Sequence, residues 1–276
     1  KRANPDMDLF SLETASYLTL SKIILDGGST NESPKPGAGH LVHIKNQDAV
    51  LALTTGTQSV APVLQNTYVY GDGGAILVDR GTVEMRAGEI KNNRVSVGSS
   101  AGSMTANGGA ICLKYSGNFI MSGGSITSNQ TDLNSTITSG TYPYGLGGAV
   151  YVGGSSSMTQ SGGTIGGTAA ANANKATLGG GVCWDSTGEV YLRDNPVIIG
   201  NYAGSSSNVK SNLYQQGSAA NKLITVSHDI LAGANVGINS PQHSSSGTRW
   251  GNNTYTKELT NLQAFSNDLD TVCVVD

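Results

Sequence analysis

Short bursts of hydrophobic residues recur along the chain, and runs of Gly, Ser and Asn separate them. Four bursts open with small residues followed by a β-branched residue, at Gly73–Ile76, Gly108–Ile111, Gly147–Val150 and Gly180–Val182. The first glycines of these openings are spaced by 35, 39 and 33 residues. Each opening leads into two further short bursts, which are typical of strands and not of helices. Such self-similarity indicates a repeat architecture.

Three short strands in each repeat predict a chain that winds once around a prism per repeat, with the strands of successive coils parallel and in register. A sheet with helical crossovers would need amphipathic helices between the strands, and the sequence shows none. A propeller blade would use four strands in about 40–45 residues and carry a Trp-Asp signature. The predicted fold is therefore all-β: a right-handed parallel β-helix of about seven coils, each with three short strands, and an irregular C-terminal cap.

The regular repeats occupy only the middle of the chain. Residues 1–70 are predicted to form degenerate N-terminal coils, residues 71–235 regular coils, and residues 236–276 the cap that an open solenoid end requires. Residues 1–276 are thus predicted to be a single β-helix domain. Because a strand pattern begins soon after Lys1, we expect a further coil or cap before it, in a larger multi-domain chain.

Period-2 alternation within the strands separates core positions from surface positions. The pairs expected to face the core are Ile76/Val78, Ile111/Leu113, Val150/Val152 and Val182/Trp184 in the first strands, and Val83/Met85, Phe119/Met121, Met158/Gln160 and Val190/Leu192 in the second. The residues expected to point outward are Leu77, Cys112, Tyr151 and Cys183 in the first strands, and Glu84, Ile120, Thr159 and Tyr191 in the second. One pair fits imperfectly, because it places Gln160 inside.

A polar residue stands three positions after the isoleucine of each third burst, at Asn93, Asn129, Thr168 and Asn201. Asparagine tolerates turn conformations, and stacked asparagines can pass amide hydrogen bonds from one coil to the next. We therefore predict a ladder of these four residues at one corner, interrupted at Thr168.

The paired motifs of each repeat are similar to a known pattern. The openings, combined with Ile90-Lys-Asn-Asn93, Ile126-Thr-Ser-Asn129 and Ile198-Ile-Gly-Asn201, resemble the GGA(I/L/V) and FxxN repeats of chlamydial polymorphic membrane protein adhesins. They resemble equally the right-handed β-helix repeats in large surface proteins of Gram-positive gut bacteria. Isoleucine in place of the phenylalanine favours the second group. The resemblance covers roughly residues 70–240 and implies a β-helix with an adhesin-like role, extracellular or at the cell surface.

Composition limits the classes of partner. The formal net charge of −3 argues against a nucleic-acid partner, because such a protein needs a basic stripe. No apolar run approaches the ~20 residues that span a bilayer, so no membrane insertion is expected. The cysteines at Cys112, Cys183 and Cys273 are widely spaced, which excludes a CxxC metal site and suits small apolar fillers.

The sequence leads us to expect neither a cofactor nor a metal site. His40 and His43 are three positions apart, which in a strand places them on opposite faces. The acidic pair Asp6 and Asp8 offers too few oxygens for calcium, which prefers six or more. Structural or solvent-facing roles are expected for all four residues.

A carbohydrate-active enzyme, either a polysaccharide lyase or a glycoside hydrolase, is the alternative to a binding protein. Hydrolysis needs two carboxylates about 5–9.5 Å apart. Asp79 and Asp185 share an outward column but lie three coil steps apart, about 14 Å at ~4.8 Å per step. Asp79 and Lys114 are neighbours in that column and are predicted to form an exposed ion pair. The GxSxG match at Gly98–Gly102 lacks the strand–turn–helix context of a nucleophile elbow, so no catalytic residue is assigned.

Aromatic residues give the strongest indication of a binding site. The longest loop, from Gln130 to Gly145, carries Tyr142 and Tyr144 around a proline, and Tyr151 follows on the outward column. Rigidly held tyrosines can stack on sugar rings or anchor a protein partner. The sequence thus predicts a non-catalytic extracellular module that binds a glycan, or a host or bacterial surface protein, through these three tyrosines.

Overall fold

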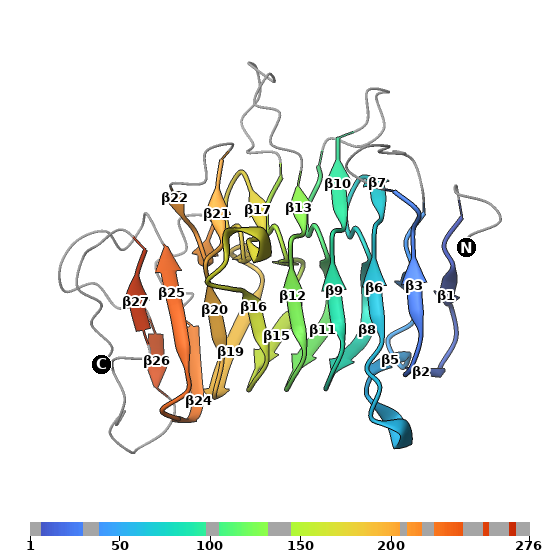
Figure 1. The fold of residues 1–276 in the computed structure, drawn as a ribbon, viewed down its shortest axis with the longest axis horizontal. Helices are drawn as coiled ribbons and strands as arrows, with labels where there is room; N and C mark the ends of the chain where they lie inside the picture. Colours follow the sequence, from blue (N-terminus) through green and yellow to red (C-terminus); the bar gives the residue numbers. More distant parts are fainter. Residues whose placement is uncertain are drawn as a thin grey trace.

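The strands of this chain stack into a parallel β-helix. A computed structural model describes residues 7–29, 39–97, 105–131, 145–204, 209–216, 224–239, 251–253 and 265–268. The strands lie side by side along the long axis of the molecule, from β1 near the N-terminus to β27 at the other end (Figure 1). Every strand pair of the large sheet in these ranges is parallel. The fold class predicted from the repeats is confirmed.

Three strand ladders run along the stack. The first contains β1 (Phe10–Leu12), β4 (Val42–Ile44), the first half of β8 (Ile76–Met85), the first half of β11 (Ile111–Met121), β14 (Val150–Val152), β18 (Val182–Trp184) and β23 (Leu213–Gln215). The second contains β2 (Tyr17–Leu20), β5 (Val50–Leu53), the second halves of β8 and β11, β15 (Ser157–Gln160), β19 (Glu189–Asp194), β24 (Ile224–Ile230) and β26 (Gly251–Asn253). The third contains β3 (Ile24–Asp26), β6 (Val63–Gln65), β9 (Glu89–Lys91), β12 (Ser125–Thr127), β16 (Thr164–Gly166), β20 (Val197–Ile199), β25 (Asn235–Asn239) and β27 (Phe265–Asn267).

A fourth, shorter ladder adds to the three strands predicted for each coil. It contains β7 (Tyr68–Tyr70), β10 (Arg94–Ser96), β13 (Gln130–Thr131), β17 (Lys175–Ala176), β21 (Tyr202–Ala203) and the antiparallel β22 (Val209–Lys210). At two or three residues each, these strands are too short to stand out in the sequence. The two 3₁₀ turns are η1 (Gly56–Gln58) and η2 (Ala170–Asn172). Within the described ranges, no helix is long and apolar enough to span a membrane.

The core runs through the middle of the coils and contains the side chains predicted to face inward. One ladder aligns the fully buried residues Ile76, Ile111, Val150 and Val182. Gln160 is buried in the second ladder, as the alternation predicts. Its Nε2 donates to the carbonyl of Val197 at 3.3 Å, while its Oε1 has no hydrogen-bond partner. The alternation therefore predicts the core correctly, even where the residue is polar.

The paired glycines of the repeat openings pack backbone against backbone. The first glycine of a pair has a positive φ, 68° at Gly108, a conformation that favours glycine. The second lies against the following coil, so a Cβ added to Gly109 would collide with the carbonyl oxygen of Gly148. The same criterion makes Gly179, with φ of 64°, the first glycine of the fourth repeat. The predicted opening starts at Gly180, so the structure moves its first glycine by one residue.

The corner after the third ladder holds the predicted asparagine ladder, with one correction. Asn93, Asn129 and Asn201 lie in it and are almost fully buried. The residue that connects Asn129 to Asn201 is Asn174 and not Thr168. The chain leaves the stack after β16, forms η2 and returns at Asn174, so the extra residues of this coil lie before the corner. The interruption predicted at Thr168 does not occur.

Each asparagine of this ladder bonds to the coils on both sides. Nδ2 of Asn129 donates to Oδ1 of Asn174 at 3.0 Å in the next coil, and to the carbonyl of Ile90 at 2.9 Å in the preceding coil. The backbone N–H of Asn129 donates to the same Oδ1 at 2.9 Å. Because a buried polar group without a partner is costly, these bonds make the corner specific for asparagine.

The ladder continues beyond the four predicted positions. On the N-terminal side, the N–H and hydroxyl of Thr67 both donate to Oδ1 of Asn93. On the C-terminal side, Asn201 donates to Oδ1 of Asn212, and Asn212 donates to the carboxylate of Asp268 at 2.8 and 2.7 Å. A single hydrogen-bonded network therefore crosses most of the stack.

The outward column of the first ladder is covered, although it points away from the core. Leu77, Cys112, Tyr151 and Cys183 stack in register, as predicted. Both cysteines are nevertheless fully buried, and Cys183 belongs to a second apolar cluster with Leu146. Chain segments that lead into the strands therefore cover this face, which the alternation within strands cannot show.

Replacing Asn129 with Leu should lower the free energy of unfolding by about 1–3 kcal/mol, because donors and acceptors in two coils lose their partner. Urea denaturation followed by circular dichroism measures this change. Thr159→Val, on the outer side of the second ladder, is the control and should stay within about 0.5 kcal/mol of the unchanged protein. An Asn129→Leu variant as stable as the control would show that the ladder is not structural.

Candidate functional site

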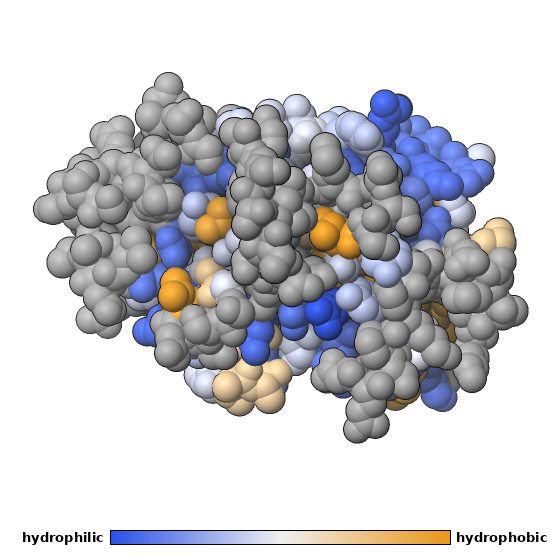
Figure 2. Space-filling view, turned by 90° about the horizontal axis from the view of Figure 1, so that it is seen from above, coloured by the Kyte–Doolittle hydropathy of each residue, from blue (hydrophilic) through white to orange (hydrophobic). Residues whose placement is uncertain are grey.

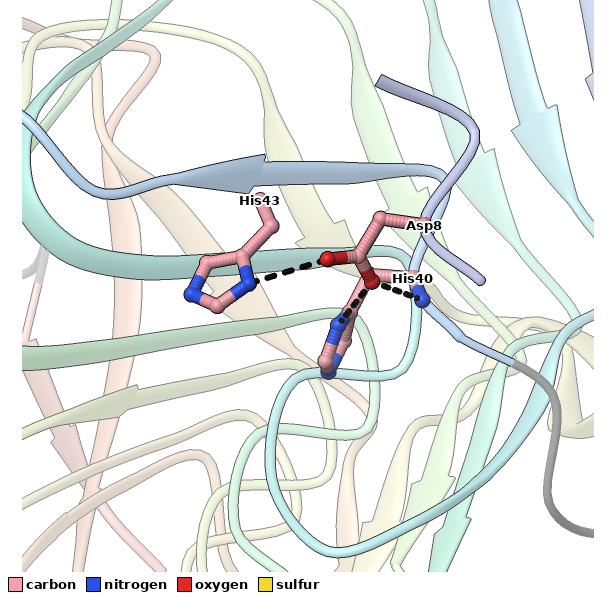
Figure 3. Close-up of side chains that lie close together, drawn as sticks. All are labelled: Asp8, His40 and His43. Atoms are coloured by element: carbon pink, nitrogen blue, oxygen red, sulfur yellow. Dashed lines mark hydrogen bonds and ion pairs between the residues drawn. The ribbon is translucent and has the colours of Figure 1, made fainter. Parts of the chain in front are cut away.

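Ionisable side chains gather on the outer side of the first ladder, at the N-terminal end of the stack. Asp8 precedes β1, His40 precedes β4, His43 lies in β4 and Asp79 lies in β8. Figure 3 shows the carboxylate of Asp8 in contact with both imidazole rings. The side chains of Asp8, His40 and His43 are only 20%, 13% and 13% exposed. We call these four residues the histidine cluster.

The prediction that His40 and His43 face opposite sides is wrong. His40 lies in the corner before β4 and not in the strand, so the period-2 alternation does not apply to it. Its ring centroid is 5.3 Å from that of His43, with the ring planes inclined by 62°. The corner is tight, since a Cβ added to Gly39 would collide with the backbone of Met7. The fold thereby brings both imidazoles to one side of the solenoid.

Hydrogen bonds fix both rings of the histidine cluster. Oδ1 of Asp8 lies 2.8 Å from Nδ1 of His40 and accepts the backbone N–H of His40 at 2.9 Å. Oδ2 of Asp8 lies 3.1 Å from Nδ1 of His43. The far nitrogens are held as well: Nε2 of His43 lies 2.9 Å from Oδ2 of Asp79, and Nε2 of His40 lies 3.0 Å from the carbonyl of Asp72. All four ring nitrogens therefore face oxygens.

Contacts within the cluster shift the pKa values of Asp8 and His43. Burial alone would raise the pKa of Asp8, but hydrogen bonds from the two histidines outweigh it and hold that pKa well below its usual range. Burial would lower the pKa of His43, and its contacts with Asp8 and Asp79 outweigh that effect and raise it. The cluster thus favours the charged forms of Asp8 and His43.

Next to the cluster, Lys114 pairs with Asp72 and not with Asp79 as predicted. Its Nζ lies 2.7 Å from Oδ2 of Asp72, whose side chain is only 5% exposed. Asp72 also accepts the backbone N–H of Asn107 at 2.7 Å. Asp79 instead faces His43, so the neighbour in the column is not the ion-pair partner. Burial acts to lower the pKa of Lys114, but Asp72 outweighs it and raises that pKa.

Of the three tyrosines predicted to bind a ligand, Tyr142 and Tyr144 lie outside the described residues. Tyr151 lies in β14, and its hydroxyl donates to Oδ2 of Asp185 at 2.9 Å. Its ring covers Gly153, where an added Cβ would clash with it, and it packs against the apolar cluster that contains Cys183. Burial and the neighbouring Asp185 raise the pKa of Tyr151. Tyr151 is thus partly a packing residue.

The two described cysteines have no arrangement that would make them reactive. Cys112 and Cys183 are free and fully buried, and burial raises the pKa of each thiol. A raised pKa keeps a thiol protonated and therefore poorly nucleophilic. Both residues act as apolar fillers, while Cys273 lies outside the described residues.

Two adjoining hollows flank the η2 turn, which stands in front of the third ladder in Figure 1. The larger has a volume of about 760 Å³, and we call it the η2 groove. Its walls include the hydroxyl groups of Ser125, Thr127 and Thr164, together with Lys91 and Asn172. The smaller hollow, of about 330 Å³, lies along the fourth ladder. Viewed from above, the described surface is mostly hydrophilic (Figure 2).

The fourth ladder presents a polar and aromatic row beside the smaller hollow. The row runs in register through Tyr68, Arg94, Gln130, Lys175 and Tyr202. Its members are partly exposed, whereas the alternate positions of these strands, such as Val95, are mostly buried. The guanidinium of Arg94 lies 4.9 Å from the centre of the Tyr68 ring, a cation–π contact.

Reasoning from the strands missed the histidine cluster because its members come from different coils. The signal was nevertheless present: Asp8 and His40 are 32 residues apart, and Asp79 follows His43 by 36. Both separations are close to one coil. Aligning ionisable residues at the repeat period, rather than within one strand, would have identified the cluster.

Comparisons with known proteins return no match: no protein-family model fits the chain, and no curated protein or solved structure is significantly similar to it.

Replacing Tyr151 with Ala should lower the free energy of unfolding by about 2 kcal/mol, because the ring leaves the apolar cluster and Asp185 loses a donor. Tyr151→Phe keeps the ring and should cost about 1 kcal/mol or less. Thermal and urea denaturation of both variants measure these changes. If Tyr151→Ala were as stable as Tyr151→Phe, the ring would have no packing role.

Proposed function

We propose that this chain is a non-catalytic binding module of a secreted or surface-displayed protein, and that its ligand is a glycan or a surface protein. The repeat motifs support the comparison with surface adhesins of Gram-positive bacteria. The parallel β-helix supplies a rigid frame on which loops and outward side chains keep fixed positions. A rigid frame reduces the entropy lost on binding.

The observation that carries this proposal is the polar η2 groove. Residues that carry hydroxyl, amide and amine groups line it from adjacent coils, among them Thr127, Thr164 and Lys91, whose amine is paired with Glu89. Ser125 and Thr164 are direct partners in the register, so their hydroxyl groups repeat at the spacing of the coils. A hollow lined this way suits a hydroxyl-rich chain that can exchange several hydrogen bonds, and glycans are the ligands with that chemistry.

The aromatic and cationic row of the fourth ladder strengthens the glycan assignment. Tyr68 and Tyr202 lie four coil steps apart in register, about 19 Å at ~4.8 Å per step. Tyrosine rings can pack against sugar rings, and Lys175 between them can bind an acidic sugar. The predicted binders Tyr142 and Tyr144 remain part of this proposal.

A carbohydrate-active enzyme is the less favoured function, because the nearest acid–base candidates are engaged. A general base works best with a pKa near the operating pH, and the pKa of Lys114 is raised away from it. Asp79 is held by His43, and Asp72 by Lys114. Side chains that are already paired with one another are better suited to stabilising the outer side of the first ladder than to transferring protons.

Replacing Thr127 and Thr164 together with Val should weaken glycan binding roughly tenfold, because two hydroxyl groups leave the groove. A glycan array followed by titration calorimetry on the best glycan measures the change. Valine favours strands, so the melting temperature should hold. Thr159→Val makes the same exchange outside the groove and should bind normally. Equal affinity of the double variant and the control would remove the groove from the proposal.

Replacing Tyr142 and Tyr144 together with Ala should weaken binding without changing the melting temperature, because a loop that displays them would lie outside the core. The same array and thermal denaturation are the measurements. Equal losses of binding and stability would show that these tyrosines pack against the fold. Incubation with the bound glycan tests the alternative: cleavage that disappears in Asp79→Ala or Lys114→Ala would overturn the non-catalytic proposal.

A further inference from the structure

We propose that Asp8, His40 and His43 form a binding site for a divalent transition-metal cation, with Zn²⁺ as its representative. This inference concerns the N-terminal strands of the first ladder, away from Tyr151, and is independent of the η2 groove. Each residue offers one ligand atom, and the three atoms lie within 4.8 Å of one another. Two imidazole nitrogens and one carboxylate oxygen are ligands that Zn²⁺ takes in proteins, often with a fourth position left to water.

The distances are compatible with a metal ion after a small movement. The ligands of a tetrahedral zinc ion with bonds of 2.0–2.2 Å lie about 3.4 Å apart. Oδ1 of Asp8 now lies 2.8 Å from Nδ1 of His40, and its Oδ2 lies 3.1 Å from Nδ1 of His43. A retreat of the carboxylate by roughly half an ångström would open that space. Asp8 stands just before the three-residue strand β1, and its side chain is 20% exposed.

The far side of each ring is arranged as in known zinc sites. A histidine that binds a metal usually donates its other N–H to a carboxylate or a backbone carbonyl, which orients the ring. Both partners are present here: Nε2 of His43 faces Asp79 at 2.9 Å, and Nε2 of His40 faces the carbonyl of Asp72 at 3.0 Å. With a metal ion bound to each Nδ1, these two oxygens would accept the Nε2 protons. The far-side contacts of both rings are therefore those that a metal-binding histidine uses.

The hydrogen-bond partners of the two rings are compatible with a cation between the Nδ1 atoms. All four ring nitrogens of His40 and His43 face carboxylate or carbonyl oxygens, and none of these oxygens carries a hydrogen when the carboxylates are ionised. A neutral imidazole has a single N–H. Two neutral rings therefore satisfy only two of the four contacts. A cation between the rings would accept the two Nδ1 lone pairs, and the two N–H groups would then satisfy the Nε2 contacts.

The local charge favours a divalent ion. Among the described neighbours, Lys45 is paired with Glu13 at 2.9 Å, and Lys114 with Asp72 at 2.7 Å. Asp8 and Asp79 present two carboxylates to the two rings. A cation of charge +2 neutralises them and leaves the imidazoles neutral. Calcium fits poorly, because it prefers six or more oxygen ligands.

The position of the site suggests what the metal does. Asp8 precedes β1 and the histidines belong to the next coil, so the ion would join two adjacent coils. We infer a structural role for the ion, in which it holds these two coils in register.

The test uses the full chain without a polyhistidine tag, freed of metal by a chelator. ZnCl₂ is titrated by calorimetry, and CoCl₂ by visible absorption, which reports coordination geometry. We expect one ion per chain, a higher melting temperature with Zn²⁺, and no response to CaCl₂. His40→Gln and His43→Gln should each weaken binding at least 100-fold. Asp79→Asn should weaken it 10- to 100-fold, since it only orients a ligand. Glu13→Gln, an acidic neighbour outside the site, should bind normally.

Nuclear magnetic resonance of the histidine rings tests the site in the unchanged protein, so the result does not depend on whether the variants fold. Zn²⁺ should shift the ring signals of two of the four histidines. The proposal is overturned if the titration with Zn²⁺ shows no heat of binding and Zn²⁺ does not raise the melting temperature, because the protein would then not bind the ion. It is overturned equally if the double variant His40→Gln/His43→Gln folds and keeps its affinity, because the ion would then bind elsewhere.

Discussion

At one corner of the solenoid, each buried asparagine receives two hydrogen bonds from the coil before it and gives two to the coil after it. This interaction fixes the register between coils. A slip of one residue would remove the asparagine from the corner and turn every core side chain outward. The flat outer faces, the η2 groove and the histidine cluster all depend on this register, because each is assembled from side chains of adjacent coils. Short strands of three or four residues suffice only because the corner repeats the same constraint in coil after coil.

Much of this fold follows from local pattern. The alternation placed Ile76, Phe119 and even Gln160 in the core, since a strand exposes its two faces in turn. Position along a coil was harder to predict. Thr168 was assigned to the corner that Asn174 occupies, because counting residues cannot reveal which segment leaves the stack. The fourth ladder was missed for a related reason: two or three polar residues after a corner carry no strand signal.

The site was less predictable than the fold. His40 and His43 were separated by an argument that holds within a strand, whereas one of them lies in a corner. Lys114 was paired with its neighbour in the column, but its long side chain reaches Asp72 instead. Both errors treat a coil as a set of independent strands. Side chains at corners and side chains of different lengths follow the three-dimensional path of the chain, which period-2 reasoning does not contain.

The asparagine ladder also has a direction. In every step the side-chain oxygen faces the N-terminal neighbour and an N–H faces the C-terminal one, so the amide dipoles align head to tail along the solenoid. Aligned amide dipoles add up, as they do in an α-helix, and leave a partial positive charge at one end. Here that end receives the carboxylate of Asp268, which accepts both donors of Asn212. The two ends of the stack are therefore electrostatically different, and the chain places an anion at the end that attracts one.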